Sequence, residues 1–222
     1  MYRIRQSSLY EIHELGLDTK NRIIYLPAVK GSSGTPEASD ISYESYDSLI
    51  KNLNILNSIS NKPIKLFVNS NGGDVLHGMG MYDAIKLSNS PVDAYCYGNV
   101  HSAASILIQA ARHRYISPNT SMLVHYGESY VAGTHRAAKN TFAYYDKLID
   151  NMLNIYAEKC QHGVHFDGMT FKQVKDMIGK EMTNKTDWWL NANDTIKFGL
   201  ADYILTKKVY KPRKPRNQVN EA

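Results

Sequence analysis

Short apolar runs alternate with helical patterns of apolar residues along the first 125 residues of the chain. Each run is rich in β-branched or aromatic residues and is bounded by turn residues, which is typical of a strand. Strands that alternate with helices favour an α/β fold in which most strands pair in parallel. The Gly/Ser/Pro-rich residues 30–39 predict an exposed loop. We expect strands at residues 22–26, 64–68, 92–97, 114–116 and 121–125, with helices between the first four of them.

The pattern changes after residue 125, where one long helix is expected at residues 136–159. A shorter helix is expected at 170–178, another from Asn191 to Gly199, and a closing strand at 202–205. The apolar residues of the long helix share one stripe, which needs a partner surface. They are Phe142, Tyr145, Ile149, Met152 and Tyr156.

A chain of 222 residues can bury a substantial core, and we expect one main domain. It contains no run of 18 or more apolar residues, and its first residues are polar instead of forming an apolar signal segment. Export and membrane spanning are therefore not expected, and a cytoplasmic location is predicted. Cys96 and Cys160 have neither the number nor the spacing of a disulfide framework or a metal site.

The formal net charge of +5 lies entirely at the C-terminal end of the chain. Residues 207–222 hold six basic residues against one acidic residue, so residues 1–206 sum to zero. We interpret this segment as a solvated basic tail, with an electrostatic contact to an acidic partner as the alternative. The neutral body does not indicate nucleic-acid binding.

Ser102 follows an expected strand directly and stands at the start of an expected helix. The first N–H groups of a helix have no intrahelical partner, and the helix dipole favours negative charge beside them. Ser102 is therefore a candidate nucleophile. The alternative is that Ser102 only caps the helix, since serine is among the favoured N-cap residues.

Acyl transfer by a serine needs a base, a group that orients the base, and donors for the oxyanion. His125 ends an expected strand and is the histidine best placed to act as the base. Asp187, next to two tryptophans, is a candidate for the orienting carboxylate. A Gly-Gly turn lets the backbone approach a ligand, so the N–H groups of Gly73 and Ala103 could form an oxyanion hole.

Other residues remain open for each of these roles. Ser105 lies three residues after Ser102 and would share its helix face. Asp194 or Asp202 could take the place of Asp187. The pair His162 and His165 has a weak metal-like spacing but no clear further ligand, so we interpret it as part of a loop and expect no metal site.

The motifs of this chain, in their order and spacing, resemble those of the ClpP family of serine peptidases. The resemblance extends from about Tyr10 to Lys207. The segments that carry it are residues 10–13 and 23–26, Val68–Gly73, Gly80–Asp83, Gly98–Ser102, Pro118–Asn119, Met122–His125, Asp187 and Phe198–Asp202.

The resemblance implies a crotonase-like α/β fold of stacked ββα units, in which the long helix protrudes as a handle toward a facing subunit. It implies a short N-terminal segment at residues 1–9, a peptidase domain at 10–206 and a basic tail at 207–222. Ser102 matches the family nucleophile, His125 the general base and Asp187 the acid that orients it. Gly73 and Ala103 match the oxyanion donors.

The same resemblance implies self-assembly into stacked rings, with heptameric rings and a tetradecamer expected. Such a chamber would hydrolyse unfolded polypeptides without a cofactor, fed by a separate Clp-type ATPase or joined by homologous ring subunits. The chain has no Gly-x-x-x-x-Gly-Lys-Ser/Thr phosphate loop of its own. Three residues depart from the usual family pattern around the site: Asn71, His101 and Ala103.

Alternative functions remain at this point. The segment Ser102–Ser105 is similar to ClpP-like peptidases of bacteriophages, so a capsid-maturation peptidase is one alternative. The others are a noncatalytic ring subunit and a crotonase-type acyl-CoA enzyme, although the latter would not need a serine, a histidine and an aspartate together. The Ser/Lys dyad of signal-peptide peptidases is not indicated, despite Lys180 and Lys185.

Overall fold

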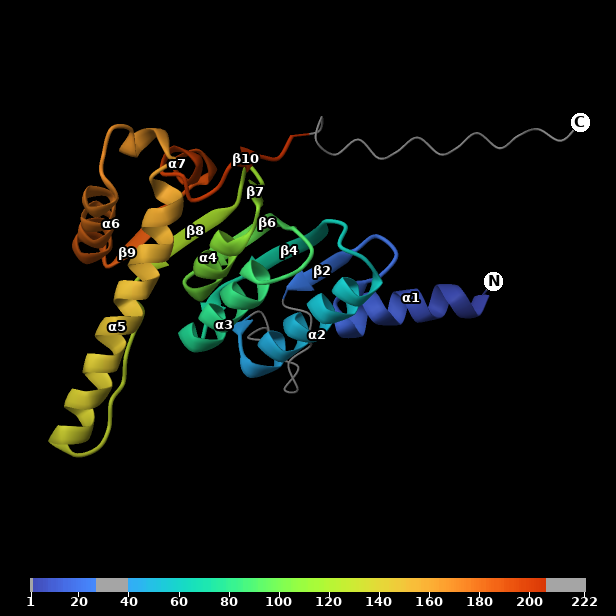
Figure 1. Cartoon of the computed structure of the whole chain (residues 1–222), viewed down its shortest axis with the longest axis horizontal. Helices are drawn as coiled ribbons and strands as arrows, with labels where there is room; N and C mark the ends of the chain where they lie inside the picture. The colour runs from blue at the N-terminus through green and yellow to red at the C-terminus, as the bar shows by residue number, and fades with distance from the viewer. Residues whose placement is uncertain (1, 27–39, 207–222) are drawn as a thin grey trace, which may run out of the picture.

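The structure of the chain is a computed structural model that describes residues 2–26 and 40–206 (Figure 1). The expected loop at 30–39 and the basic tail at 207–222 lie outside the described residues. The main sheet is formed by β1 (Leu17–Asp18), β2 (Ile23–Leu26), β4 (Ile64–Ser70), β6 (Val92–His101), β7 (His113–Ile116), β8 (Ser121–His125), β9 (Asp187–Leu190) and β10 (Tyr203–Ile204).

Six of these eight strands follow the order β1-β2-β4-β6-β7-β10; β8 also pairs with β6, and β9 pairs with β8. The first half of β6 pairs with β7, and its last residues, Asn99 to His101, pair with Ser121 to Leu123 of β8. Only the β1–β2 and β8–β9 pairs of the described sheet are antiparallel. The expected α/β fold with largely parallel pairing is confirmed. A small second sheet joins β3 (Asp40–Ile41) to β5 (Gly72–Gly73).

The central helices α2, α3 and α4 bury apolar residues against the main sheet. In Figure 1, α2, α3 and α4 lie side by side along it, and α5 projects well beyond it with α6 at its side. Within α2, Leu49, Leu53 and Leu56 are buried at helical spacing, and a capping box at Ser42 starts the helix. The helices are α1 (Tyr2–Leu15), α2 (Tyr43–Ile59), α3 (Val75–Lys86), α4 (Ala103–Leu107), α5 (His135–Cys160), α6 (Phe171–Lys185) and α7 (Ala192–Lys197).

The long helix α5 has two different halves. Met152 and Tyr156 in its C-terminal half are buried, so this part of the apolar stripe packs within the chain. Of the stripe residues in its N-terminal half, Phe142 is exposed and Tyr145 is half-buried; Tyr144, next to the stripe, is also exposed. The expected stripe therefore finds a partner surface along only half of its length among the described residues.

The opposite face of the sheet carries a row of aromatic rings. In β4, Leu66 is buried against the helices while Phe67 points to the other face, as the alternation of a strand requires. Phe67 stacks on Tyr25 and on Tyr95, with ring centroids 5.3 Å apart in both cases. Tyr95 stacks in turn on Tyr115, and Tyr115 stacks on Tyr203, so the row crosses five strands.

Several elements differ from the sequence expectations. The two-residue strands β1, β3 and β5 were not expected, and β6 continues to His101. No helix was predicted before β1, yet α1 occupies Tyr2–Leu15. The helix expected at 170–178 continues to Lys185. The strand β9 was not expected, and it gives Asp187 a fixed place beside β8 where a loop carboxylate would have none.

Candidate active site

The turn between β6 and α4 holds Ser102 in a strained backbone conformation. Its φ of 52° and ψ of −125° lie outside the regions that residues with a Cβ ordinarily occupy. Ser102 occupies the N-cap position of α4, but its side chain makes no capping hydrogen bond. The Oγ atom lies instead 2.7 Å from Nε2 of His125. The hydroxyl is therefore directed at a base and not at the helix it precedes.

Strand pairing brings the histidine and the aspartate to this serine. The N–H of Ser102 donates to the carbonyl of Leu123 in β8, at 2.9 Å, which places Ser102 next to the end of that strand. His125 ends β8 and stands opposite Asp187 in the antiparallel β8–β9 pair. Nδ1 of His125 lies 3.0 Å from Oδ1 of Asp187.

This arrangement can transfer a proton from the serine to the histidine. When Nδ1 carries the proton of the neutral imidazole and donates it to Asp187, Nε2 is free to accept from the Ser102 hydroxyl. The Asp187 side chain is 49% exposed, so solvent screens its charge and its clearest contribution is to orient the His125 ring.

The Gly-Gly turn of β5 approaches the serine so closely that no side chain fits. A Cβ on Gly72, whose φ is +96°, would lie 2.6 Å from Cβ of Ser102. A Cβ on Gly73, whose φ is +137°, would lie 2.5 Å from the carbonyl oxygen of Ile41. Gly73 and Ala103 line the same cleft beside Ser102, where the sequence predicted an oxyanion hole.

The cleft at Ser102 has a volume of ≈ 480 Å³ and a largely apolar wall on one side. Val75 lies in α3, Ile106 in α4 and Leu123 in β8. Ile149 and Met152 close the cleft from α5. The wall can therefore accommodate an apolar side chain next to the reacting atoms.

The structure places the alternative residues elsewhere. Ser105 is fully buried, and its Oγ donates to the carbonyl of Ser102. Asp194 accepts a hydrogen bond from Nδ2 of Asn191 at the start of α7. Asp202 is paired with Arg114; burial alone would raise the pKa of Asp202, but the hydrogen bonds and charge of Arg114 outweigh it and the pKa is lowered.

Neither a metal nor a cysteine nucleophile is indicated by the described residues. The ring of His165 packs on that of Phe198 at a centroid distance of 4.5 Å, away from His125. Within residues 2–26 and 40–206, no group of three or more His, Cys, Asp or Glu side chains could hold a metal ion.

Burial raises the pKa of both Cys96 and Cys160 to about 12, so both remain protonated thiols near neutral pH.

His101 and Asn71, two departures from the family pattern, have identifiable environments. His101 is 9% exposed and meets the Trp189 ring edge-on at 5.0 Å. Burial lowers the pKa of His101, and the nearby His125 lowers it further. Asn71 accepts a hydrogen bond at 2.8 Å from Nδ2 of Asn99, which ties the Gly-Gly turn to β6.

Comparison with known proteins identifies the family. Residues 37–208 match the family model described as Clp protease. The chain is 30% identical over 165 residues to the ATP-dependent Clp protease proteolytic subunit 2 of Pseudomonas aeruginosa, covering 72% of this chain and 74% of that protein. It is 29% identical over 191 residues to the ATP-dependent Clp protease proteolytic subunit of Carsonella ruddii, covering 85% and 86%.

A solved structure agrees with these relatives. A mutant of ClpP1 from Listeria monocytogenes superimposes with a TM-score of 0.64 at 26% identity, covering 84% of this chain and 92% of that one. None of the helices in the described ranges combines the length and apolar character needed to cross a membrane. Since the family model covers well over half of the sequence, the chain belongs to the Clp protease family of serine peptidases.

Proposed function

We propose that this chain is a proteolytic subunit that cleaves peptide bonds of unfolded polypeptides with Ser102 as nucleophile. The observation that carries the proposal is the continuous contact from Ser102 Oγ to His125 Nε2 at 2.7 Å and from His125 Nδ1 to Asp187 Oδ1 at 3.0 Å. A serine that only capped α4 would not need to point at an imidazole.

In the proposed reaction, Ser102 Oγ attacks the carbonyl carbon of the substrate while Nε2 of His125 takes the hydroxyl proton. The oxyanion that forms is stabilised by the N–H groups of Gly73 and Ala103. His125 then donates the proton to the leaving amine, and the acyl-enzyme forms. In the second half, His125 takes a proton from a water molecule that attacks the acyl carbon and returns it to Ser102 Oγ as the carboxylic acid product leaves. Asp187 holds the ring in the orientation that both transfers require.

The lining of the cleft supports a preference for an apolar residue on the acyl side of the cleaved bond. Ile106, Leu123 and Met152 would contact that side chain and remove its apolar surface from water. Each additional buried methylene contributes roughly 0.8 kcal/mol, so we expect peptides with leucine or methionine there to react faster than those with alanine.

We also propose that copies of this chain assemble into stacked heptameric rings, giving a tetradecamer. The exposed Phe142 and Tyr144 on the projecting half of α5 support contact with a second copy, because burying them would remove apolar surface from water. The relatives are named ATP-dependent Clp protease proteolytic subunits, and a separate ATPase is proposed to supply unfolded substrate. The aromatic row through Phe67 and Tyr115 is the surface we propose for that ATPase.

The test compares wild type with Ser102→Ala and with Ser129→Ala, a serine that lines the same cleft outside the Ser102–His125–Asp187 contacts. Hydrolysis of a fluorogenic peptide and of an unfolded protein is measured with and without a Clp-type ATPase, and light scattering gives the assembly mass. We expect Ser102→Ala to abolish hydrolysis without changing the mass, while Ser129→Ala retains activity. Equal turnover by wild type and Ser102→Ala would contradict the proposal, as would an inactive wild type, which would favour a noncatalytic ring subunit.

A further inference from the structure

We propose that Ser105 and Tyr156 are positioning residues that orient and polarise the oxyanion-binding peptide group between Ser102 and Ala103. The inference rests on the proposed function, in which Ser102 is the nucleophile and the N–H of Ala103 stabilises the oxyanion. Neither residue lines the cleft, so both act through that peptide group.

The hydroxyls of Tyr156 and Ser105 form a chain that ends on the nucleophile's own carbonyl. Ser105 Oγ donates to the carbonyl oxygen of Ser102 at 2.7 Å, and the Tyr156 hydroxyl lies 2.6 Å from the same Oγ. A serine hydroxyl has one proton to donate. Because Ser105 gives its proton to Ser102, the Tyr156 hydroxyl must be the donor to Ser105.

The carbonyl of Ser102 and the N–H of Ala103 belong to the same planar peptide group. That carbonyl accepts two hydrogen bonds, one from Ser105 Oγ and one from the backbone N–H of Ser105 at 2.9 Å. Hydrogen bonds accepted at a carbonyl withdraw electron density from the amide and strengthen its N–H as a donor. They also fix the plane of the peptide, whose orientation beside the cleft is set by the unusual φ and ψ of Ser102.

Burial keeps this chain of hydroxyls dry and fixed. Ser105 is 0% exposed and Tyr156 is 1% exposed, so water does not replace either hydroxyl as a partner. Burial also raises the pKa of Tyr156, which keeps its hydroxyl protonated and able to donate. Tyr156 belongs to α5 and Ser105 to α4, so the contact joins two helices through residues that are 51 positions apart in the chain.

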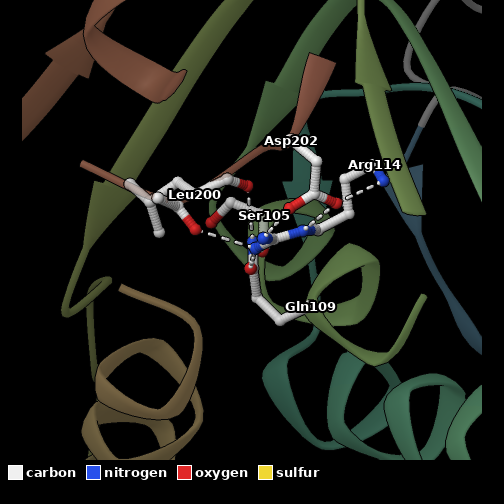
Figure 2. A network of polar contacts seen from close by, with 6 residues as sticks. Ser105, Gln109, Arg114, Leu200 and Asp202 are labelled. Atoms are coloured by element: carbon white, nitrogen blue, oxygen red, sulfur yellow. Dashed lines mark hydrogen bonds and ion pairs between the residues drawn. The ribbon is translucent and has the colours of Figure 1, made fainter. Parts of the chain in front are cut away.

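A second set of contacts holds Ser105 from its backbone side (Figure 2). Nε2 of Gln109 donates to the carbonyl of Ser105 at 2.8 Å. The guanidinium of Arg114 donates to Oε1 of Gln109 and is paired with Asp202. Figure 2 shows the Arg114 side chain between Asp202 and Gln109, and Gln109 also joined to Ser105 and Leu200. The Ser105 hydroxyl is thus attached to a rigid buried framework and can define the position of the Ser102 carbonyl.

The expected loss of kcat can be scaled from the effect of removing a whole oxyanion donor. Removing such a donor lowers kcat by about 10²–10³-fold, and hydrogen-bond cooperativity strengthens a bond by about 10–30%. Loss of the polarising contact removes about 10–30% of the free energy that the donor contributes, and therefore about 10–30% of those two to three powers of ten in kcat. We therefore expect kcat to fall by about two- to eight-fold. We expect Ser105→Ala to show this loss and Tyr156→Phe to show a smaller one, because Ser105 still donates to Ser102 when Tyr156 is replaced.

The experiment measures kcat and KM for a fluorogenic peptide, and the inhibition constant of a peptide aldehyde that forms a tetrahedral adduct. In Ser105→Ala we expect kcat to fall and the inhibition constant to rise by similar factors, with KM unchanged. The double variant should be no slower than Ser105→Ala, since Tyr156 acts through Ser105. Tyr82→Phe, which removes the hydroxyl of a mostly buried tyrosine in α3, is the matched control and should leave all three constants unchanged.

Unfolding in urea is measured for every variant, because a purely structural role would lower stability without separating kcat from KM. Unchanged kcat and inhibition constants in both Ser105→Ala and Tyr156→Phe would overturn the inference, as would a rise in KM without a fall in kcat. Ser102→Ala separates a failure of the positioning role from a failure of the proposed function. An inactive Ser102→Ala beside unaffected positioning variants leaves the proposed function standing, whereas an active Ser102→Ala overturns the proposed function itself.

Discussion

Replacing Ser102 by glycine should stabilise the fold relative to replacing it by alanine, although both variants lose the nucleophile. Both substitutions remove the same hydrogen bond to His125, so the difference between them isolates the backbone. The φ of 52° and ψ of −125° match the first central position of a type II′ turn, which favours glycine. Alanine would keep the strain that its Cβ imposes there.

The magnitude follows from two opposing terms. A residue with a Cβ in such a conformation carries about 1–3 kcal/mol of strain. Glycine lowers stability by about 0.5–1 kcal/mol through the greater freedom of the unfolded chain. We therefore expect Ser102→Gly to be more stable than Ser102→Ala by about 1 kcal/mol, which corresponds to a Tm higher by about 2–4 °C for a chain of this size.

Urea unfolding followed by tryptophan fluorescence measures this difference, because Trp188 is buried and reports on the fold. All variants are compared at equal protein concentration, since assembly makes apparent stability depend on concentration. Should Ser102→Ala prove more stable than Ser102→Gly by 0.5–1 kcal/mol or so, as at an ordinary backbone position, the strain argument is refuted.

Three further outcomes are expected. Arg114→Leu removes the guanidinium that pairs with Asp202 and leaves only the backbone N–H of residue 114 as a donor to that carboxylate, so urea unfolding should show a loss of about 3–5 kcal/mol; a loss below 1 kcal/mol or so would contradict the role of the pair. The pKa of His101 is lower in the folded state than in the unfolded chain, so the unfolded chain binds the proton more tightly and the free energy of unfolding should fall as pH drops below about 6.5. His101→Ala should remove part of this dependence when urea unfolding is measured from about pH 7 to pH 5. Gly72→Ala would force Ser102 away from its base, and peptide hydrolysis should drop by about 10²-fold; near-normal turnover would mean that the turn can shift freely.

The fold was largely predictable because its strands and helices have clear periodicity. The strand expected at residues 121–125 is observed at Ser121–His125, and the long helix expected at 136–159 runs from His135 to Cys160. Short antiparallel additions were not predictable in the same way. In β9 only Trp188 and Leu190 are buried, and a four-residue strand carries too little alternation to stand out from a loop.

The candidate site depended on contacts that spacing alone does not give. Sequence reasoning proposed Asp187 but left Asp194 and Asp202 open, because the β8–β9 register that sets Asp187 opposite His125 is a tertiary feature. Ser105 was considered as a nucleophile on its helical spacing, which says nothing about the Tyr156 hydroxyl that arrives from α5. The sequence offered one signal of that contact: Ser105 and Tyr156 each place a hydroxyl on an otherwise apolar helix face, where it needs a buried partner.

The most direct test of the central claim is to locate the residue that a fluorophosphonate modifies. The protein is treated with the reagent, digested and analysed by mass spectrometry, with His125→Ala treated in parallel. Activation of the Ser102 hydroxyl by His125 predicts a single adduct on Ser102 in the wild type and a much slower reaction in His125→Ala. An adduct on Ser105, or peptide hydrolysis that persists after complete modification of Ser102, would contradict the account.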